Sequence, residues 1–372
     1  MSSTLSQLVD EVLGFIHRPE LEQFDSLAMR IFDYQRRAVP AYREYCGQLG
    51  IGPDGATLPA EIPFVSTIAF KYVMLAAKGA AETRGACEFL TSGTTSGAER
   101  RGRHLVQYPE VYRASALAHL RAMLFCDLPE GARMRILAMH PTAERMAESS
   151  LSAMITWCIE EFGEPKSRCV ADRERVDIDA AVAYLREAAA MHAPVCVLGT
   201  TAGFAALFER VKESRERFIL GPGSRMMDTG GPKGQRVPLA PGEVAARAAG
   251  LLGIAEDLVI NEYGMTELCS QLYDATRFNS EFATASGERV KLAPPWMRPA
   301  AIDPATMRRL PDGTPGMLAF IDLANVCSVA AVMTEDIGIV EGKRVRLFGR
   351  ARASDARGCA LSIEMFAAAA SR

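Results

Sequence analysis

The sequence predicts a layered α/β fold, preceded by a helical segment and followed by a β-rich part. Short apolar runs alternate with longer amphipathic runs from residue 87 to residue 261. Apolar residues recur at helical spacing before this region, and prolines interrupt the short apolar runs that follow it. With 372 residues, 49% of them hydrophobic, the chain can bury a large core.

Residues 1–86 are expected to form an N-terminal helical cap and a linker. Apolar side chains repeat at helical spacing over residues 5–16 and again over residues 24–34, and Pro40 ends this pattern. Residues 50–59 are rich in glycine and proline, which is typical of an exposed loop. The first strand is therefore expected only at residue 87.

Residues 87–275 are expected to form the α/β core. The apolar runs predict strands at residues 87–90, 134–140, 167–170, 195–198, 226–228 and 258–261. The amphipathic runs predict helices at residues 109–125, 149–162, 178–191, 202–211 and 243–252. Such alternation indicates parallel strands joined by helical crossovers, with ligands bound at the carboxyl ends of the strands.

Residues 276–372 are expected to form a small β-rich subdomain with a short C-terminal tail. Four prolines between residues 294 and 304 would interrupt any long helix, and residues 316–323 and 344–348 have the apolar character of strands.

The net charge of −3, from 42 basic and 45 acidic residues, gives no electrostatic reason to expect nucleic acid or an anionic membrane as a partner. The nine cysteines form no CxxC pair or metal-ligand spacing, which is typical of reduced thiols. Asp10 and Glu11 interrupt the N-terminal apolar stretch, and no later segment has the length of a membrane span. A soluble cytoplasmic protein is therefore expected.

Three polar, glycine-containing segments follow predicted strands. Glycine allows close backbone approach to a ligand, and N–H and hydroxyl groups can donate to phosphate oxygens. The third segment adds an aromatic ring for a base and a carboxylate for Mg²⁺. Any one of them alone could equally be an ordinary surface turn. The segments are Thr91-Ser92-Gly93-Thr94-Thr95-Ser96, then Gly230-Gly231, then Tyr263-Gly264-Met265-Thr266-Glu267.

These segments, followed by Thr334-Glu335-Asp336 and Gly349-Arg350, occur in an order that resembles the acyl-adenylate-forming superfamily. Within it, the chain resembles the LuxE family of acyl-protein synthetases over nearly its whole length. This resemblance implies a fold like the N-terminal domain of adenylate-forming enzymes. It also implies ATP and Mg²⁺ as cofactors, and a carboxylic acid, with a fatty acid favoured, as substrate.

The resemblance further implies a role for each motif residue. Thr91, Ser92, Gly93, Thr94, Thr95 and Ser96 would wrap the ATP phosphates. Gly230 and Gly231 would flank the adenine, which Tyr263 and Gly264 would line. Thr266 would lie near the α-phosphate, Glu267 would bind Mg²⁺, Asp336 would hold the ribose hydroxyls, and Arg350 would lie beside the hinge of the nucleotide site.

The chain departs from the superfamily pattern in two places. The phosphate loop lacks the usual lysine, so that Arg100, Arg101 or Arg103 would supply the cation, and the sequence does not decide which. The mobile C-terminal domain of longer relatives is expected to be largely absent, because the chain ends at residue 372, soon after Arg350.

Cys359 is the candidate acyl acceptor, since no C-terminal domain would deliver CoA. The adjacent Arg357 favours a thiolate and Gly358 allows access, and thiolates are strong nucleophiles. In the LuxE family the acylated cysteine lies near the C-terminus, which Cys359 matches. The alternative is a buried structural thiol, which is expected for the other eight cysteines.

His104 and His140 are expected to be packing or hydrogen-bonding residues rather than bases, and His140 with Pro141 is a hypothetical wall of the substrate pocket. The predicted activity is ATP-dependent acyl-adenylate formation, then thioester formation on Cys359 and, by resemblance, delivery to a reductase partner. One alternative is a ligase that uses CoA or a carrier protein. Another is a degenerate protein that binds acyl or nucleotide ligands without turnover.

Overall fold

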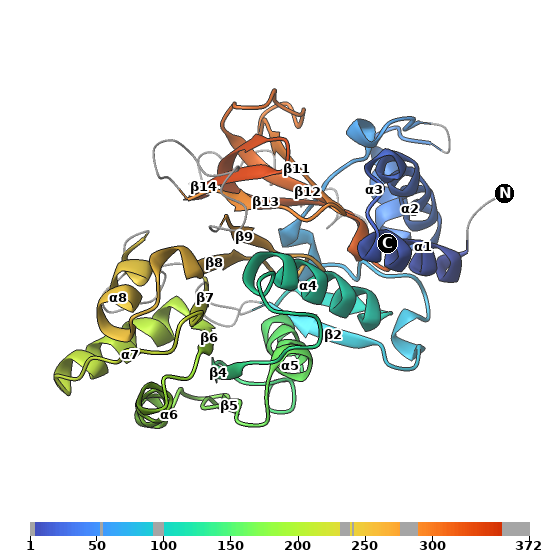
Figure 1. The fold of residues 1–372 in the computed structure, drawn as a ribbon. Helices are drawn as coiled ribbons and strands as arrows, with labels where there is room; N and C mark the ends of the chain where they lie inside the picture. Colours follow the sequence, from blue (N-terminus) through green and yellow to red (C-terminus); the bar gives the residue numbers. More distant parts are fainter. Residues whose placement is uncertain are drawn as a thin grey trace. The chain divides into compact units, whose positions relative to one another are not determined.

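The computed structural model describes residues 4–52, 55–91, 100–230, 239, 242–275 and 289–351. The chain divides into two compact units. The first comprises Met1–Ala118, Met265–Gln271 and Lys291–Arg372, and the second comprises His119–Gly264 and Leu272–Val290. Helix α4 (Pro109–Leu124) carries the chain from the first unit to the second (Figure 1).

Three helices begin the first unit: α1 (Leu5–His17), α2 (Phe24–Ala38) and α3 (Pro40–Gln48). The Thr4 hydroxyl caps α1 by accepting a 3.3 Å hydrogen bond from the backbone N–H of Gln7. Leu8 and Val12 lie on one face of α1 and are fully buried, as the apolar spacing predicts. The expected N-terminal helices are confirmed. The expectation that Pro40 ends the helical pattern is wrong, since Pro40 is the first residue of α3, a position where the missing N–H of proline costs no hydrogen bond.

The first unit also contains an antiparallel sheet in the order β11-β12-β13-β14-β10. The expected β-rich C-terminal part is thereby confirmed. The strand at residues 65–66 corrects the expectation that the first strand begins at residue 87, since it pairs in parallel with β13. The strands are β1 (Val65–Ser66), β10 (Lys291–Leu292), β11 (Met297–Ile302), β12 (Gly316–Asp322), β13 (Ala331–Glu341) and β14 (Arg344–Arg350).

Strands β2 (Cys87–Leu90) and β3 (Arg103–Val106) form a separate antiparallel hairpin in the first unit. The expectation that residues 87–90 begin a parallel series is therefore wrong. The physical reason is local: the two strands are close in sequence, and their pairing continues past β2, where Thr91 N–H donates to the carbonyl of Gly102 at 2.9 Å. Such short-range closure favours antiparallel pairing over a helical crossover.

The second unit is built on a sheet in the order β9-β8-β7-β6-β4-β5 (Figure 1). The five strands from β8 to β5 pair in parallel, and β9 is antiparallel to β8. The predicted α/β architecture with parallel strands is confirmed here. The strands are β4 (Arg135–Met139), β5 (Arg168–Cys169), β6 (Val195–Thr200), β7 (Arg225–Thr229), β8 (Val259–Tyr263) and β9 (Leu272–Asp274).

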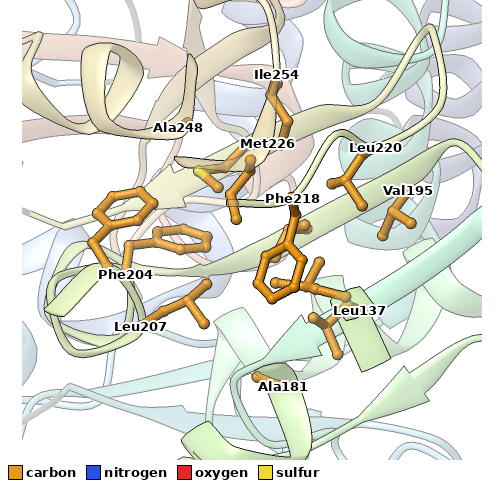
Figure 2. Close-up of a cluster of buried hydrophobic side chains, with 14 of the residues drawn as sticks. Leu137, Ala181, Val195, Phe204, Leu207, Phe218, Leu220, Met226, Ala248 and Ile254 are labelled. Carbon is orange, nitrogen blue, oxygen red and sulfur yellow. The ribbon is translucent and has the colours of Figure 1, made fainter. Parts of the chain in front are cut away.

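Helical crossovers connect the parallel strands and bury their apolar faces against the sheet. Side-chain caps begin three of them: Ser149 accepts from Ser152 N–H at 3.2 Å, Asp177 from Ala180 N–H at 2.9 Å, and Thr200 from Gly203 N–H at 3.2 Å. Figure 2 shows the apolar cluster that forms the core of this unit, to which β4, β6, β7, β8 and the helices α6 (Ile178–Ala190), α7 (Thr201–Glu213) and α8 (Glu243–Leu252) contribute. The remaining helix between parallel strands is α5 (Ser150–Phe162).

A buried side chain in α2 fixes the loop that precedes β13 in the first unit. Gln35 donates to the carbonyl oxygens of Asn325 and Val326 at 2.8 and 3.1 Å, and accepts from Ala330 N–H at 2.9 Å. Because each of these backbone groups is buried, leaving one unpaired would cost about 1–3 kcal/mol. The N-terminal helices thus hold the loop that carries Asn325 and Ser328.

Candidate functional site

The predicted phosphate loop begins at Thr91, where β2 ends, while Ser92, Gly93, Thr94, Thr95 and Ser96 lie outside the described residues. Two hydrogen bonds close the base of this loop. Besides the backbone bond from Thr91 to Gly102, the Thr91 hydroxyl accepts from Gly102 N–H at 2.8 Å. A Cβ atom at residue 102 would lie 2.9 Å from the Thr91 side chain, so any other residue would have to displace that side chain.

Two of the three candidate arginines take part in the same hairpin. Arg101 donates to the carbonyl oxygens of Thr91 and Leu90 at 2.5 and 3.2 Å. Arg103 pairs with Glu88, which lies diagonally across the hairpin, at 2.7 Å. Arg101 therefore supports the base of the predicted loop, while Arg103 has a carboxylate partner.

Gly230 lies directly after β7 with a φ of +91°, a conformation that side-chain-bearing residues rarely adopt. Its carbonyl accepts from the Thr201 hydroxyl at 3.2 Å and lies 3.4 Å from the Asn261 amide nitrogen. Both side chains also donate to the buried carboxylate of Asp228, at 2.8 and 3.0 Å. Residues of β7, β8 and α7 therefore fix Gly230, whereas Gly231 lies outside the described residues.

Tyr263 is the last residue of β8 and Gly264 follows it, at the same edge of the second unit's sheet as Gly230. The parallel pairing of β7 with β8 sets Thr229 opposite Glu262, so the next residues along the two strands, Gly230 and Tyr263, are neighbours. The Thr229 hydroxyl donates to the Glu262 carboxylate. The structure thus brings together the two predicted adenine-contacting segments as far as they are described.

Glu267, in the first unit, is a buried carboxylate with only 8% of its surface exposed. Burial raises its pKa to about 7, while its own backbone N–H and the charges of Arg350 and Lys71 act in the opposite direction. The charge of Glu335 adds to the increase. A carboxylate held in this way is costly to ionise without a further cation, which is a property of metal-binding and catalytic carboxylates.

Asp336 and Arg350 are cross-strand neighbours on β13 and β14. Arg350 Nε lies 3.9 Å from Asp336 Oδ1, and its Nη1 lies 3.6 Å from Glu335 Oε2. Because these ion pairs are long and the arginine side chain is half-exposed, they contribute little to stability. The first unit therefore gathers Glu267, Asp336 and Arg350, three of the residues chosen from sequence.

The segment that carries Thr266 and Glu267 is held by three buried side chains that sequence reasoning did not place in the site. His104 Nδ1 lies 2.7 Å from the carbonyl oxygen of Thr266, and the Asn325 amide donates to that of Glu267 at 2.8 Å. Asp322 accepts from Cys269 N–H at 3.0 Å and from the Ser270 hydroxyl at 2.7 Å. Burial raises the pKa of Asp322 to about 6.

His104 is confirmed as a hydrogen-bonding residue. Burial lowers its pKa to about 4, while the hydrogen bond to Thr266 acts in the opposite direction. His140, in the second unit, has its pKa lowered to about 4 by burial, and its Nε2 lies 3.2 Å from the Ser152 hydroxyl. Its role as a substrate-pocket wall stays a prediction.

Five of the eight described cysteines are buried: Cys46, Cys158, Cys196, Cys269 and Cys327. Burial raises the pKa of both Cys196 and Cys327 to about 12, so neither is a ready nucleophile at neutral pH. Cys126 is the exposed thiol among the described residues. Cys359 lies outside them.

A stability difference follows from the raised pKa of Glu267. The folded state binds the Glu267 proton more tightly than the unfolded state does. Deprotonation of Glu267 therefore lowers the free energy of unfolding as the pH rises above 4.5, and the full loss is reached above about pH 7. Glu267→Gln should therefore leave the free energy of unfolding unchanged near pH 4.5 and raise it by about 3 kcal/mol at pH 8. Urea unfolding at both pH values measures this.

Glu335→Gln is the matched control, since Glu335 pairs with Arg350, whose charge also acts on Glu267, but is more exposed than Glu267. It should change stability little at either pH. An effect of Glu267→Gln that is the same at pH 4.5 and pH 8 would contradict the assigned burial of this charge.

In the part of the chain that the structure describes, no helix has both the length and the apolar character needed to cross a bilayer.

Known structures first define the fold as that of adenylate-forming ligases. A 2-hydroxyisobutyryl-CoA ligase bound to its acyl-AMP has a TM-score of 0.62 at 17% identity, covering 90% of this chain and 69% of that one. An open form of the same ligase, in complex with acyl-AMP and CoA, has a TM-score of 0.61, covering 88% of this chain and 74% of that one. At this identity the similarity shows the fold alone.

The chain belongs to the LuxE family of acyl-protein synthetases, whose family model matches residues 21–367. It is 22% identical over 377 aligned residues to the long-chain-fatty-acid–luciferin-component ligase of Aliivibrio fischeri, covering 96% of this chain and 94% of that protein. A shorter match, 38% identical over 77 residues, is to the ligase of the same name from Vibrio harveyi and covers 19% of this chain and 20% of that protein. The expected class, an acid–thiol ligase, is confirmed.

Proposed function

We propose that this chain binds ATP·Mg²⁺ and a carboxylic acid, forms an acyl-adenylate, and transfers the acyl group to its own Cys359. The family assignment supports acyl-protein synthetase chemistry. The observation that carries the proposal is Glu267: a buried carboxylate of raised pKa, subject to the positive charges of Arg350 and Lys71. This environment suits a group that binds a cation beside a polyphosphate.

In the first step an oxygen of the substrate carboxylate attacks the α-phosphorus of ATP. The bond from this phosphorus to the oxygen that bridges to the β-phosphate breaks, and pyrophosphate leaves. Protein groups accelerate such a displacement by alignment and by stabilising charge at the phosphorus. The Thr266 hydroxyl would donate to the α-phosphate, and the Arg350 guanidinium would neutralise developing charge.

In the second step the thiolate of Cys359 attacks the acyl carbon. The bond between this carbon and the phosphate oxygen breaks, AMP leaves with that oxygen, and a thioester remains on the protein. The proton of the thiol is released to solvent when the thiolate forms. No external acyl acceptor is needed for this step.

Mg²⁺, when bound, would neutralise charge on the triphosphate. In the described segments no three His, Cys, Asp or Glu side chains gather into a metal site. Mg²⁺ commonly takes only one or two carboxylates, with phosphate oxygens and waters completing its octahedron. Glu267 fits that pattern, because it is a single buried carboxylate in a segment held by Asn325 and Asp322.

The remaining nucleotide contacts are assigned by the motif each residue matches. Asp336 would hold the ribose hydroxyls, which is supported by its place opposite Arg350 on the paired strands. Gly230 and Gly231 would flank the adenine and Tyr263 would line it, which is supported by the adjacency of Gly230 and Tyr263 at the ends of β7 and β8. Gly264 would allow the base to approach the backbone.

The phosphates would be held by the loop that starts at Thr91 and continues through Ser92, Gly93, Thr94, Thr95 and Ser96. The closed base of the hairpin supports this assignment, because the two hydrogen bonds between Thr91 and Gly102 define where the loop leaves and rejoins the strands. Arg100 would provide the cation, since Arg101 and Arg103 are engaged at the base of the loop.

A long-chain fatty acid is the proposed substrate, on the basis of the relative from Aliivibrio fischeri, whose name describes a long-chain-fatty-acid ligase. A reductase that accepts the acyl group from Cys359 is the proposed partner. Both proposals rest on similarity at 22% identity and on the family assignment.

Acid-dependent exchange of radiolabelled pyrophosphate into ATP tests the first step. The enzyme is incubated with ATP, Mg²⁺ and each of a panel of saturated fatty acids and aromatic acids. Exchange that requires one class of acid supports acyl-adenylate formation and identifies the substrate class. Absence of exchange with every acid would overturn the proposed function.

A further inference from the structure

His104 is the side chain that joins the base of the predicted phosphate loop to the segment carrying Glu267. It lies on β3, two residues after Gly102, whose backbone N–H and carbonyl both bond to Thr91. From this strand its Nδ1 reaches the carbonyl oxygen of Thr266 at 2.7 Å, and its Nε2 lies 2.9 Å from the Ser328 hydroxyl.

The hydrogen-bond partners determine which ring nitrogen carries the proton. A carbonyl oxygen can only accept, so Nδ1 must be the donor to Thr266. Nε2 is then the acceptor in a neutral ring, and the Ser328 hydroxyl donates to it. Ser328 thereby favours the tautomer with the proton on Nδ1, which the bond to Thr266 needs. The loop that carries Ser328 is held by Gln35, which bonds to the backbone of Asn325, Val326 and Ala330.

Burial and the packing of Phe70 hold the His104 ring in a single orientation. The side chain is 2% exposed, and the Phe70 ring packs edge-on against the imidazole with 5.5 Å between centroids. A buried ring with both nitrogens bonded can neither rotate nor change partners without leaving a buried polar group unsatisfied. The position of the Thr266 carbonyl is therefore tied to β3 by a rigid link.

We infer that His104 is a positioning residue for ATP·Mg²⁺ binding, which holds Thr266 and Glu267 in register with the strand returning from the phosphate loop. This inference rests on the proposed function, because it assumes that Glu267 binds the metal and that the loop holds the phosphates. His104 itself touches neither. Its effect is to fix the backbone from which the Glu267 carboxylate and the Thr266 hydroxyl extend.

The test compares His104→Asn with His104→Leu. Asparagine can place an amide N–H near the position of Nδ1 and so retain the bond to Thr266, whereas leucine fills the space without a donor. Partners that orient a metal-ligating group typically contribute about 10- to 100-fold to metal affinity or activity. His104→Leu should weaken binding of Mn²⁺ in the presence of ATP at least about tenfold, and His104→Asn less than about threefold.

Two readouts are measured on the full chain. Electron paramagnetic resonance titration of Mn²⁺ with ATP reports binding without turnover, and pyrophosphate exchange gives KM for the metal–nucleotide complex and kcat. A positioning role predicts that His104→Leu raises KM by about tenfold or more and that His104→Asn restores most of the loss. Equal defects in the two variants, or normal binding by His104→Leu, would overturn the inference.

Two further variants separate folding from positioning. His119→Leu is the matched control, since His119 is also buried and packs on Tyr273 within the second unit. Its Mn²⁺·ATP affinity should stay within about threefold of wild type. If His104→Leu does not fold, Ser328→Ala takes its place, because it removes only the hydroxyl that selects the tautomer. It should weaken Mn²⁺·ATP binding by about threefold or more, and an unchanged affinity would overturn the inference.

The two proposals fail in distinguishable ways. A wild-type enzyme that binds Mn²⁺·ATP but exchanges pyrophosphate with no acid would overturn acyl-adenylate formation, while the binding data would still decide the role of His104. A wild-type enzyme that does not bind Mn²⁺·ATP would overturn both.

Discussion

Glu267→Gln is expected to lower acid-dependent pyrophosphate exchange by roughly 100-fold or more in a protein that is no less stable than wild type. Glutamine keeps the shape of the side chain but removes the charge that would bind Mg²⁺ on the triphosphate. Burial makes that charge costly in the free protein, where it raises the pKa of Glu267 to about 7. Stability and activity should therefore change in opposite directions, measured by urea unfolding and by exchange at pH 8.

Glu335→Gln is again the control, because it removes a carboxylate that pairs with Arg350 and is more exposed than Glu267. It should retain exchange within about threefold of wild type. The assignment of Glu267 would be contradicted if both variants exchanged pyrophosphate at the wild-type rate. It would also be contradicted if Glu267→Gln lost activity only because it unfolds.

Cys359→Ala is expected to abolish covalent acylation of the protein while leaving pyrophosphate exchange within about threefold of wild type. The thiol acts only after the adenylate has formed, so its removal blocks the second step and not the first. Intact-mass spectrometry after incubation with ATP, Mg²⁺ and the active acid measures the adduct. Neutral hydroxylamine, which cleaves thioesters, should remove the adduct from the wild-type chain.

Cys126→Ala provides the comparison, since Cys126 is an exposed thiol in the described part of the chain and would react if acylation were unspecific. This variant should acquire the acyl group as wild type does. A hydroxylamine-labile adduct that persists in Cys359→Ala would show that the acceptor is another residue. Formation of a soluble thioester at equal rates by Cys359→Ser and wild type, with CoA or a carrier protein present, would indicate an external acceptor instead.

The parallel part of the fold was predictable because each strand and each crossover helix has a local signature. Residues 134–140 and 195–198 are short apolar runs, and both became buried parallel strands with helices packed on them. β1 was not predictable, since two residues carry no periodicity and their pairing with β13 joins positions more than 260 residues apart. The antiparallel β2–β3 hairpin was missed because its strands are short and enclose a long polar segment.

The site was predictable where chemistry is carried by a motif and unpredictable where it depends on burial. Glu267 was chosen for its residue type and position, and the structure adds that it is buried with a raised pKa. His104, Asn325 and Asp322 hold its segment from three separate parts of the chain. The sequence indicates that His104 forms hydrogen bonds but not with which partner, and neither residue type nor spacing identifies Asn325 and Asp322, because these contacts arise only when the three parts are folded together.

Transfer of ¹⁸O from a labelled acid to AMP tests the central claim, acyl-adenylate formation, most directly. The enzyme is incubated with ATP, Mg²⁺ and an acid labelled at both carboxyl oxygens, and the released AMP is analysed by mass spectrometry. Attack of the carboxylate on the α-phosphorus, followed by acyl transfer to a thiol, leaves one acid oxygen on each AMP. Labelled AMP is the predicted result. Unlabelled AMP, or ADP together with labelled inorganic phosphate, would contradict the proposed reaction.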